Sequence, residues 1–292
     1  MISSQEGLVG LAAAVSCAAA LRSTWSPCGL SILSTMTPLA ERGRRHHFAA
    51  TAAWFVAGAL LGGASLGLVA VIAEIGASAV GLAPPAHGGA TVAFAAAACA
   101  ACAAWAFDLE LFGLRLPIHR RQVNEDWLDL YRPWVYGSGF GWQIGSGLAT
   151  YVMTAGTYLT VVLSALSGSS EAALSIGVVF GLVRGLAIFL GAGITSPARL
   201  VSFHRRLSSL AGPSRVAISI VEGAVVVAAT GAVGGWSAGT AAAAVVFVVT
   251  VAARTRPSPA RAPAPGAVVP GSSISARQSV TANSQARSHF HR

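Results

Sequence analysis

Residues 22–31 read RSTWSPCGLS and lie within the first long apolar stretch of the chain. Proline lacks a backbone donor and interrupts a helix, so Pro27 predicts a break in this stretch. Cys28 follows with a thiol, which can undergo redox chemistry or bind a metal. Inside a membrane, a broken helix is tolerated only where it faces protein or a water-filled cavity. The segment therefore predicts a site within the bilayer, with Pro27 and Cys28 at that site.

The composition is typical of an integral membrane protein. The 292 residues are 54% hydrophobic and 10% charged, and the mean hydropathy is +0.66, whereas a soluble domain has about 25% charged residues. Apolar runs of about 20 residues, long enough to span a bilayer, recur along the chain. We expect an all-α, polytopic fold of about seven transmembrane helices, with a range of six to eight, over residues 7–36, 48–80, 91–107, 137–166, 172–195, 216–234 and 238–253.

The distribution of arginine predicts the orientation. All 19 Lys and Arg residues are arginines, and only Arg22 and Arg184 fall within predicted spans. The other arginines fall in alternate connections and in the C-terminal segment, while the connections near 81–90, 167–171 and 234–238 contain none. The positive-inside rule then places the N-terminus outside and the C-terminus in the cytoplasm. We expect a multi-pass protein of the inner (plasma) membrane of a bacterium.

Two regions are expected, a transmembrane domain over 1–253 and a basic cytoplasmic tail over 254–292. The tail contains six arginines, no acidic residue and many prolines and serines. Such a composition cannot form a packed core, so the tail is predicted to be disordered. The net charge of +9 comes largely from this tail, and it favours contact with the lipid bilayer over nucleic acid.

The four cysteines, Cys17, Cys28, Cys99 and Cys102, all fall within predicted spans. This placement argues against an extracellular disulfide framework. Cys99 and Cys102 are one helical turn apart on the third predicted span. They are interpreted either as small side chains at a helix contact or as a buried dithiol. Because no set of residues has the spacing of a zinc site, no metal and no cofactor are expected.

Charged and polar residues within the spans are candidate substrate-binding positions. A charged side chain in a membrane is costly and is a functional candidate by default. Arg184 is the deepest and the best candidate for a contact with an anion or a substrate. For Arg22, the alternative to substrate binding is a structural ion pair with Glu222. The predicted substrate-binding set is Arg22, Pro27, Gln143, Thr150, Thr154 and Arg184.

Residues 24–31, followed by Pro38, resemble the Ser-Pro-Cys motif in the first span of the CcdA/DsbD family, transmembrane proteins of cytochrome c biogenesis and thiol–disulfide exchange. Residues 113–121 are similar to the basic segment after that family's third span, and residues 139–142 resemble the start of its fourth. The resemblance implies a LysE-type core of two inverted three-helix repeats, with helices 1 and 4 broken near the midplane. It also implies transfer of reducing equivalents from a thioredoxin-like partner.

The second redox cysteine of that family is missing, because no cysteine follows Cys102. Thiol–disulfide exchange needs an attacking and a resolving sulfur, so Cys28 would have to react with Cys99 or Cys102. Three functions remain open. The favoured one is movement of a small solute through a midplane polar site, and the others are thiol–disulfide transfer and a non-catalytic membrane scaffold for another membrane protein. We do not expect an enzyme, unless it is a thiol–disulfide oxidoreductase.

Overall fold

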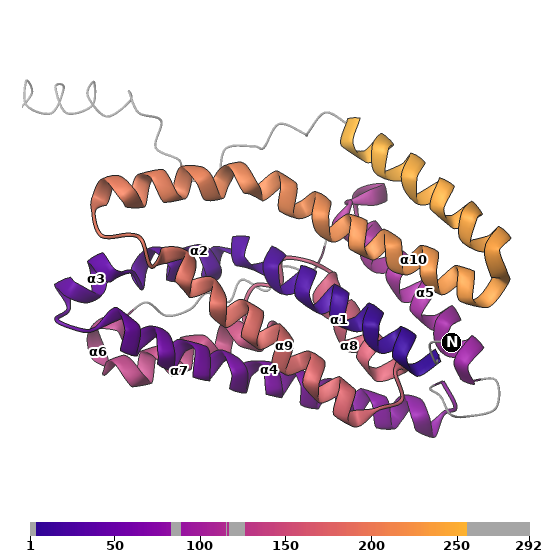
Figure 1. Ribbon diagram of the computed structural model, residues 1–292, viewed down its shortest axis with the longest axis horizontal. Coiled ribbons are helices and arrows are strands. Elements are labelled where there is room, and N and C mark those ends of the chain that lie inside the picture. Colours follow the sequence, from indigo (N-terminus) through magenta and orange to yellow (C-terminus); the bar gives the residue numbers. More distant parts are fainter. Residues whose placement is uncertain (1–3, 83–88, 115, 117–125, 256–292) are drawn as a thin grey trace, which may run out of the picture. The chain divides into compact units, whose positions relative to one another are not determined.

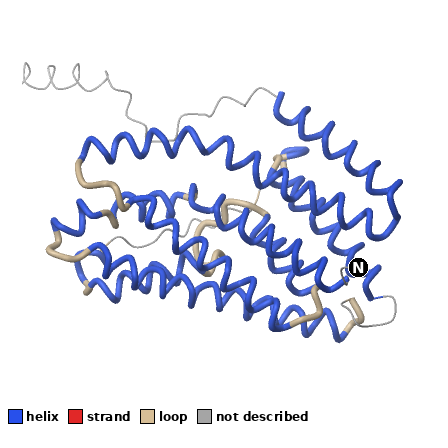
Figure 2. Tube along the Cα trace, viewed as in Figure 1, coloured by secondary structure: helices blue, strands red, loops and turns tan. Residues whose placement is uncertain are grey.

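The computed structural model describes residues 4–82, 89–114, 116 and 126–255. These residues form helices and contain no strands (Figure 2). Five helices are long and apolar enough to cross a membrane by length and composition: Ser4–Trp25, Phe48–Ala79, Gly89–Asp108, Ser170–Gly191 and Pro197–Ala253. The expected all-α class is therefore confirmed, while the expected count of about seven spans is not.

The chain divides into two units, Met1–Arg254 and Thr255–Arg292, and the description below concerns the first. Residues 256–292 lie outside the described part, so the disordered basic tail stays a prediction. Most of the basic segment near 113–121 also lies outside it.

The first predicted span is broken where Pro27 predicts a break. Helix α1 covers Ser4–Arg22, a short 3-10 turn η1 covers Ser23–Trp25, and helix α2 covers Pro27–Thr35 (Figure 1). Ser26 is extended between them, with φ −65° and ψ 153°, and its hydroxyl accepts a hydrogen bond from Gly29 N at 3.1 Å. Proline fits the first turn of a helix because its missing N–H would have no partner there. Ser26 and Pro27 therefore start α2 rather than distort a continuous helix.

The fourth predicted span, 137–166, also consists of two pieces. Helix α7 covers Pro133–Gly145 and helix α8 covers Gly156–Leu166, with residues 146–155 between them outside regular helix. At about 1.5 Å per residue, each piece is shorter than the roughly 30 Å hydrocarbon core of a bilayer. A break was predicted here, and it explains why no single helix in this region is long enough to cross a membrane.

The remaining elements are labelled in Figure 1 where there is room. They are α3 (Pro38–Gly43), α4 (Phe48–Ala79), α5 (Gly89–Asp108), η2 (Leu111–Gly113), α6 (Trp127–Leu130), α9 (Ser170–Leu186), η3 (Ala187–Gly191) and α10 (Pro197–Thr255).

Helix α4 packs tightly against both α7 and α9 through glycines. A Cβ atom placed on Gly63 would overlap the backbone of Gly177 and Gly181 in α9. On the α7 side, a Cβ on Gly145 would overlap the backbone of Ala59. Small residues allow membrane helices to approach with their backbones nearly in contact. The glycines of these helices therefore bring the backbone of α4 into close contact with α7 and α9.

Helix α10 contains a sharp reversal at Gly235. This residue has φ 73° and ψ −170°, a conformation that favours glycine. The two arms pack against each other, since a Cβ on Gly223 would meet the Val246 side chain at 2.6 Å and one on Gly231 would lie 3.6 Å from Gly239 Cα. The reversal falls within the short turn predicted between spans 216–234 and 238–253, and Figure 1 shows the two arms folding back on one another.

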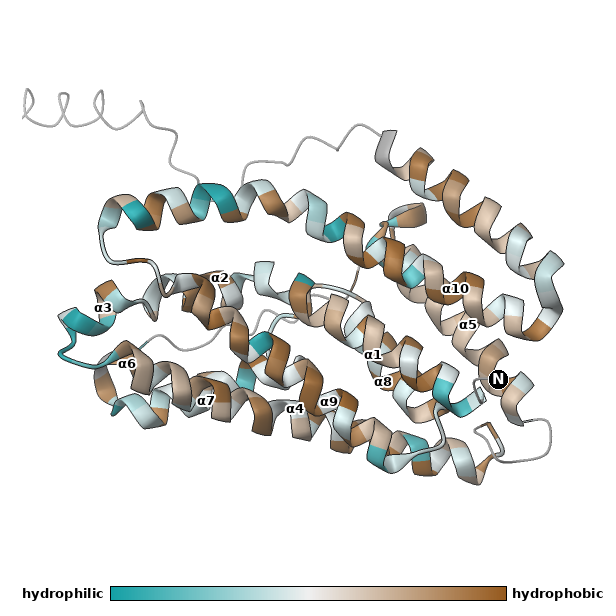
Figure 3. Ribbon diagram, viewed as in Figure 1, coloured by the Kyte–Doolittle hydropathy of each residue, from teal (hydrophilic) through white to brown (hydrophobic). Residues whose placement is uncertain are grey.

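The buried core forms three clusters that follow this arrangement. The largest joins α1, α5, α8 and α10, the second joins α2, α4 and α7, and a small third joins α1, α4, α9 and α10. Figure 3 shows hydrophilic residues on α3 and on the first half of α10, while α4 and α9 are mainly apolar. Many large apolar side chains remain exposed, including Leu61, Ile72 and Phe247, as a lipid-facing surface requires.

Candidate functional site

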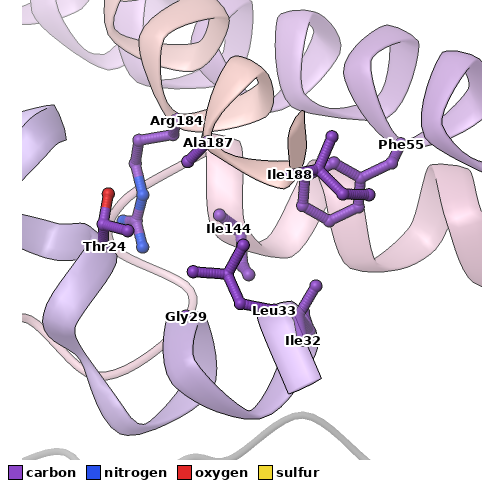
Figure 4. Close-up of a pocket in the computed structure, with 9 residues that line it drawn as sticks. All are labelled: Thr24, Gly29, Ile32, Leu33, Phe55, Ile144, Arg184, Ala187 and Ile188. Carbon is purple, nitrogen blue, oxygen red and sulfur yellow. The ribbon is translucent and has the colours of Figure 1, made fainter. Parts of the chain in front are cut away.

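A small cavity lies where the first broken helix meets α4, α7 and α9. Its volume is about 20 Å³, and its walls are mostly apolar. The residues that line it are Thr24, Gly29, Ile32, Leu33, Phe55, Ile144, Arg184, Ala187 and Ile188 (Figure 4). The cavity thus lies between the break in the first span and Arg184, and Ile144 is the residue of the fourth predicted span in its lining.

Arg184 supplies the only charge in the cavity wall. Its side chain is 3% exposed, and Figure 4 shows it extending from its helix to lie beside Thr24. Nη2 donates to the Ser23 carbonyl at 3.5 Å, and the guanidinium lies 5.8 Å from the Phe180 ring centroid. No carboxylate of the described residues lies within 4.0 Å of it. Arg184 is thus a buried cation that contacts a carbonyl and an aromatic ring and interacts electrostatically with Cys28.

The break at Ser26 shapes the other side of the cavity. Gly29 lies in the first turn of α2, and a Cβ at this position would meet the Thr24 carbonyl oxygen at 2.5 Å. The Ser23 carbonyl, which accepts from Ser26 N at 3.0 Å, also faces Arg184. Pro27 therefore acts through the backbone that it organises, and it does not itself line the cavity.

Other predicted substrate-binding residues lie away from this cavity. Arg22 is buried, but it donates to the Ala211 carbonyl at 3.3 Å and to the Ser214 hydroxyl at 2.9 Å, both on α10. The predicted pair of Arg22 with Glu222 is not formed. Thr154 donates to the Asp108 carboxylate, which also accepts from Ala155 N at 2.7 Å. Arg22 thus joins α1 to α10, and Thr154 joins the connection between α7 and α8 to the end of α5.

Gln143 and Thr150 complete the predicted set, and neither lines the cavity. Gln143 is half-buried, and its carbonyl accepts from the Ser146 hydroxyl at 2.9 Å. Thr150 is 2% exposed, and its hydroxyl has no hydrogen-bond partner in the described part of the chain.

A second group of buried polar atoms lies between α5 and α10. The indole nitrogen of Trp105 is buried without a hydrogen-bond partner among the described residues. The Glu222 carboxyl group is also buried, and it interacts with the carboxyl group of Asp108. Trp105 Nε1 lies against the residue next to Glu222, since a Cβ on Gly223 would be 3.7 Å from it. No cavity adjoins Glu222 among those described.

Sequence reasoning missed a buried carboxylate at Glu41. Its side chain is completely buried and accepts from the Thr51 hydroxyl at 2.7 Å, the Tyr136 hydroxyl at 2.8 Å and Arg44 Nη1 at 3.3 Å. Burial and the carboxylate together raise the pKa of Tyr136 to about 12, so the phenol remains a donor. Glu41 precedes a run of arginines in a predicted connection, and nothing local distinguishes it from a solvated acid.

The cysteines do not form the redox arrangement predicted from sequence. No disulfide joins any of the four, all of which are described. Cys28 is buried with α2, α4 and α7, whereas Cys99 and Cys102 are exposed on α5. The structure therefore does not bring Cys28 together with Cys99 or Cys102 as a reacting pair.

The fold and the site define a helical, membrane-type protein with two broken helices around a buried arginine. No model of a known protein family matches the chain, and no solved structure matches it. The chain is similar to curated bacterial proteins named "Methylamine utilization protein MauF". The protein of Paracoccus versutus is 30% identical, and the match covers 62% of this chain and 63% of the relative. The protein of Paracoccus denitrificans is 31% identical, and the match covers 61% of this chain and 62% of the relative. That of Methylophilus methylotrophus is 29% identical over 64% of each chain.

The matched region thus spans less than two thirds of each of these relatives. Their name overturns the assignment to the CcdA/DsbD family and, with it, the expected functions of small-solute transport and thiol–disulfide transfer. Nothing in the described structure supports a thioredoxin-like partner. The physical reason for the error is that Ser26 and Pro27 are a helix start. Any membrane helix that restarts after a break can use the same residues.

Proposed function

We propose that this chain is an integral membrane protein that takes part in methylamine utilization in a bacterium. The observation that carries the proposal is the similarity to several relatives that share one name, "Methylamine utilization protein MauF", at 28–31% identity. The five long apolar helices support a role within a membrane. The Arg184 cavity and the broken helices around it are the part of the described chain that we propose as its functional centre.

The proposal is tested by deleting the gene from its bacterium of origin and comparing growth on methylamine with growth on succinate and ammonium. We expect loss of growth on methylamine, unchanged growth on succinate, and recovery when the gene is returned on a plasmid. A deletion strain that grows normally on methylamine would contradict the proposal.

We further propose a multi-pass protein of the inner membrane with the N-terminus outside and the C-terminus in the cytoplasm. The support is the arginine distribution, together with the apolar length of the helices. A fluorescent protein fused after residue 253 is expected to fluoresce, and alkaline phosphatase fused at the same position is expected to be inactive. The opposite pair of results would reverse this topology. The inverted repeat of three helices also stays a proposal, supported by the equivalent breaks at α1–α2 and α7–α8.

A further inference from the structure

The charge of Arg184 is not balanced by any acidic side chain of the described structure. No carboxylate of the described residues lies within 4.0 Å of the guanidinium, and its described hydrogen bond is a long one of 3.5 Å to the Ser23 carbonyl. A guanidinium has five N–H donors, and a buried charge without a counter-charge is strongly destabilising. An additional negative partner would remove this cost.

The space for such a partner lies directly beside Arg184. The cavity volume of about 20 Å³ exceeds the roughly 10–15 Å³ that one water molecule requires. It is too small for sulfate, phosphate or an organic acid. A monatomic ion or a single water is the largest occupant that fits without movement of the walls.

The polar groups of the cavity favour a negative occupant. Besides Arg184, they are the Thr24 hydroxyl and the first turn of α2 at Gly29. The start of a helix carries a partial positive charge, and the Gly29 N–H there already donates to Ser26 Oγ at 3.1 Å. The remaining walls are apolar side chains such as Ile32 and Phe55, which cannot stabilise a cation.

We propose that this cavity binds a monovalent anion of the size of chloride, held by Arg184 and Thr24 at the break between α1 and α2. Such an anion would neutralise the buried guanidinium and fix the broken first helix against α9. The site is independent of the proposed role in methylamine utilization, because it rests only on the geometry around Arg184.

One other negative charge could take this place. Cys28 is close enough to Arg184 to interact with it electrostatically, so a thiolate there would be an internal counter-charge. Replacing Cys28 by alanine removes the thiolate and leaves the cavity lining unchanged. If the anion is the partner, the Cys28→Ala variant keeps its response to chloride.

The test is the thermal unfolding midpoint of the purified full-length chain in detergent, as gluconate is replaced by chloride at constant ionic strength. We expect a saturable rise of about 5 °C at a concentration about 100 times Kd, with bromide giving the same response. The Arg184→Gln variant is expected to show no rise. The matched control Arg205→Gln removes an exposed arginine and is expected to behave as the wild type.

A second variant keeps the test decisive if Arg184→Gln does not fold. Ala187→Val adds two methyl groups to the cavity wall and leaves the guanidinium in place, so it is expected to abolish the chloride response. Bromide in crystals of the wild type is expected to give an anomalous peak beside Arg184. The proposal is overturned by a flat wild-type titration, by equal responses in wild type and Arg184→Gln, or by loss of the response in Cys28→Ala.

Discussion

The Tyr136 hydroxyl donates a 2.8 Å hydrogen bond to the buried carboxylate of Glu41, across 95 residues of sequence. This bond joins α7 to α3 at the end of the bundle. The His46 ring nitrogen Nδ1 lies 3.3 Å from the same hydroxyl. The buried Glu41 carboxylate thus links segments that the sequence places in different connections between predicted spans.

Removing the phenol tests this link. We expect Tyr136→Phe to lower the free energy of unfolding by about 2 kcal/mol near pH 8, because a hydrogen bond to a buried charge is lost. Denaturant unfolding in detergent measures it, with Tyr158→Phe as the control because Tyr158 is 40% exposed. Equal stability of the two variants would show that the bond contributes nothing.

The same residue predicts a pH dependence. The pKa of Tyr136 is raised from 10.0 to about 12, so the unfolded chain loses this proton at a lower pH than the folded chain. The contribution to stability is therefore complete below about pH 10 and is lost as the pH rises towards 12. Comparing unfolding of wild type and Tyr136→Phe from pH 9 to 12 measures it. The stability difference between them should shrink over this range, and a constant difference would refute the assignment.

The glycine contacts of α4 predict that the stability cost of a Gly→Ala substitution depends strongly on its position in the helix. Gly63→Ala places a Cβ against the backbone of α9, with Gly181 Cα at 2.8 Å, and should cost about 3 kcal/mol of unfolding free energy. Gly76→Ala lies in the same helix with no atom within 4 Å and should be neutral or stabilising, since alanine favours a helix. Similar midpoints for the two variants would mean that α4 does not pack this closely.

The reversal in α10 depends on Gly235. With φ 73° and ψ −170°, this position should strain any other residue, so Gly235→Ala is expected to cost about 2 kcal/mol. Gly10→Ala, at an open helical position of α1, is the control. A Gly235→Ala variant as stable as the control would indicate a continuous α10.

The exposed cysteines are expected to be dispensable. The relatives' name gives no support to thiol–disulfide transfer, and Cys99 and Cys102 pair with no other cysteine. The Cys99→Ser/Cys102→Ser double variant, returned to the deletion strain, should restore growth on methylamine to the wild-type rate. A growth rate near that of the deletion strain would restore a chemical role to these thiols.

Local signals in the sequence predicted much of the fold. Pro27 acts on its own turn, so the break between α1 and α2 could be placed to the residue. The apolar runs placed α4 and α5 close to where they are observed, whereas α10 begins at Pro197, well before the predicted span start at 216. The charge of Arg184 within an apolar run likewise marked it as buried. Each of these signals depends on chemistry within about one helical turn.

Long-range partners could not be predicted in the same way. Arg22 binds the Ala211 carbonyl and the Ser214 hydroxyl, because the geometry of α10 presents these groups and not Glu222. Glu41 is buried only because Thr51 and Tyr136 come to it from two other helices. The motif around Cys28 led to a wrong family assignment, because a local helix start carries no information about a partner sulfur elsewhere in the chain.

Growth rate on methylamine tests the central claim most directly. The deletion strain is compared with the same strain carrying the wild-type gene, with methylamine or succinate as the carbon source. We predict that the ratio of the two rates falls to near zero on methylamine and stays near one on succinate. Equal growth of the two strains on methylamine would contradict a role for this protein in methylamine utilization.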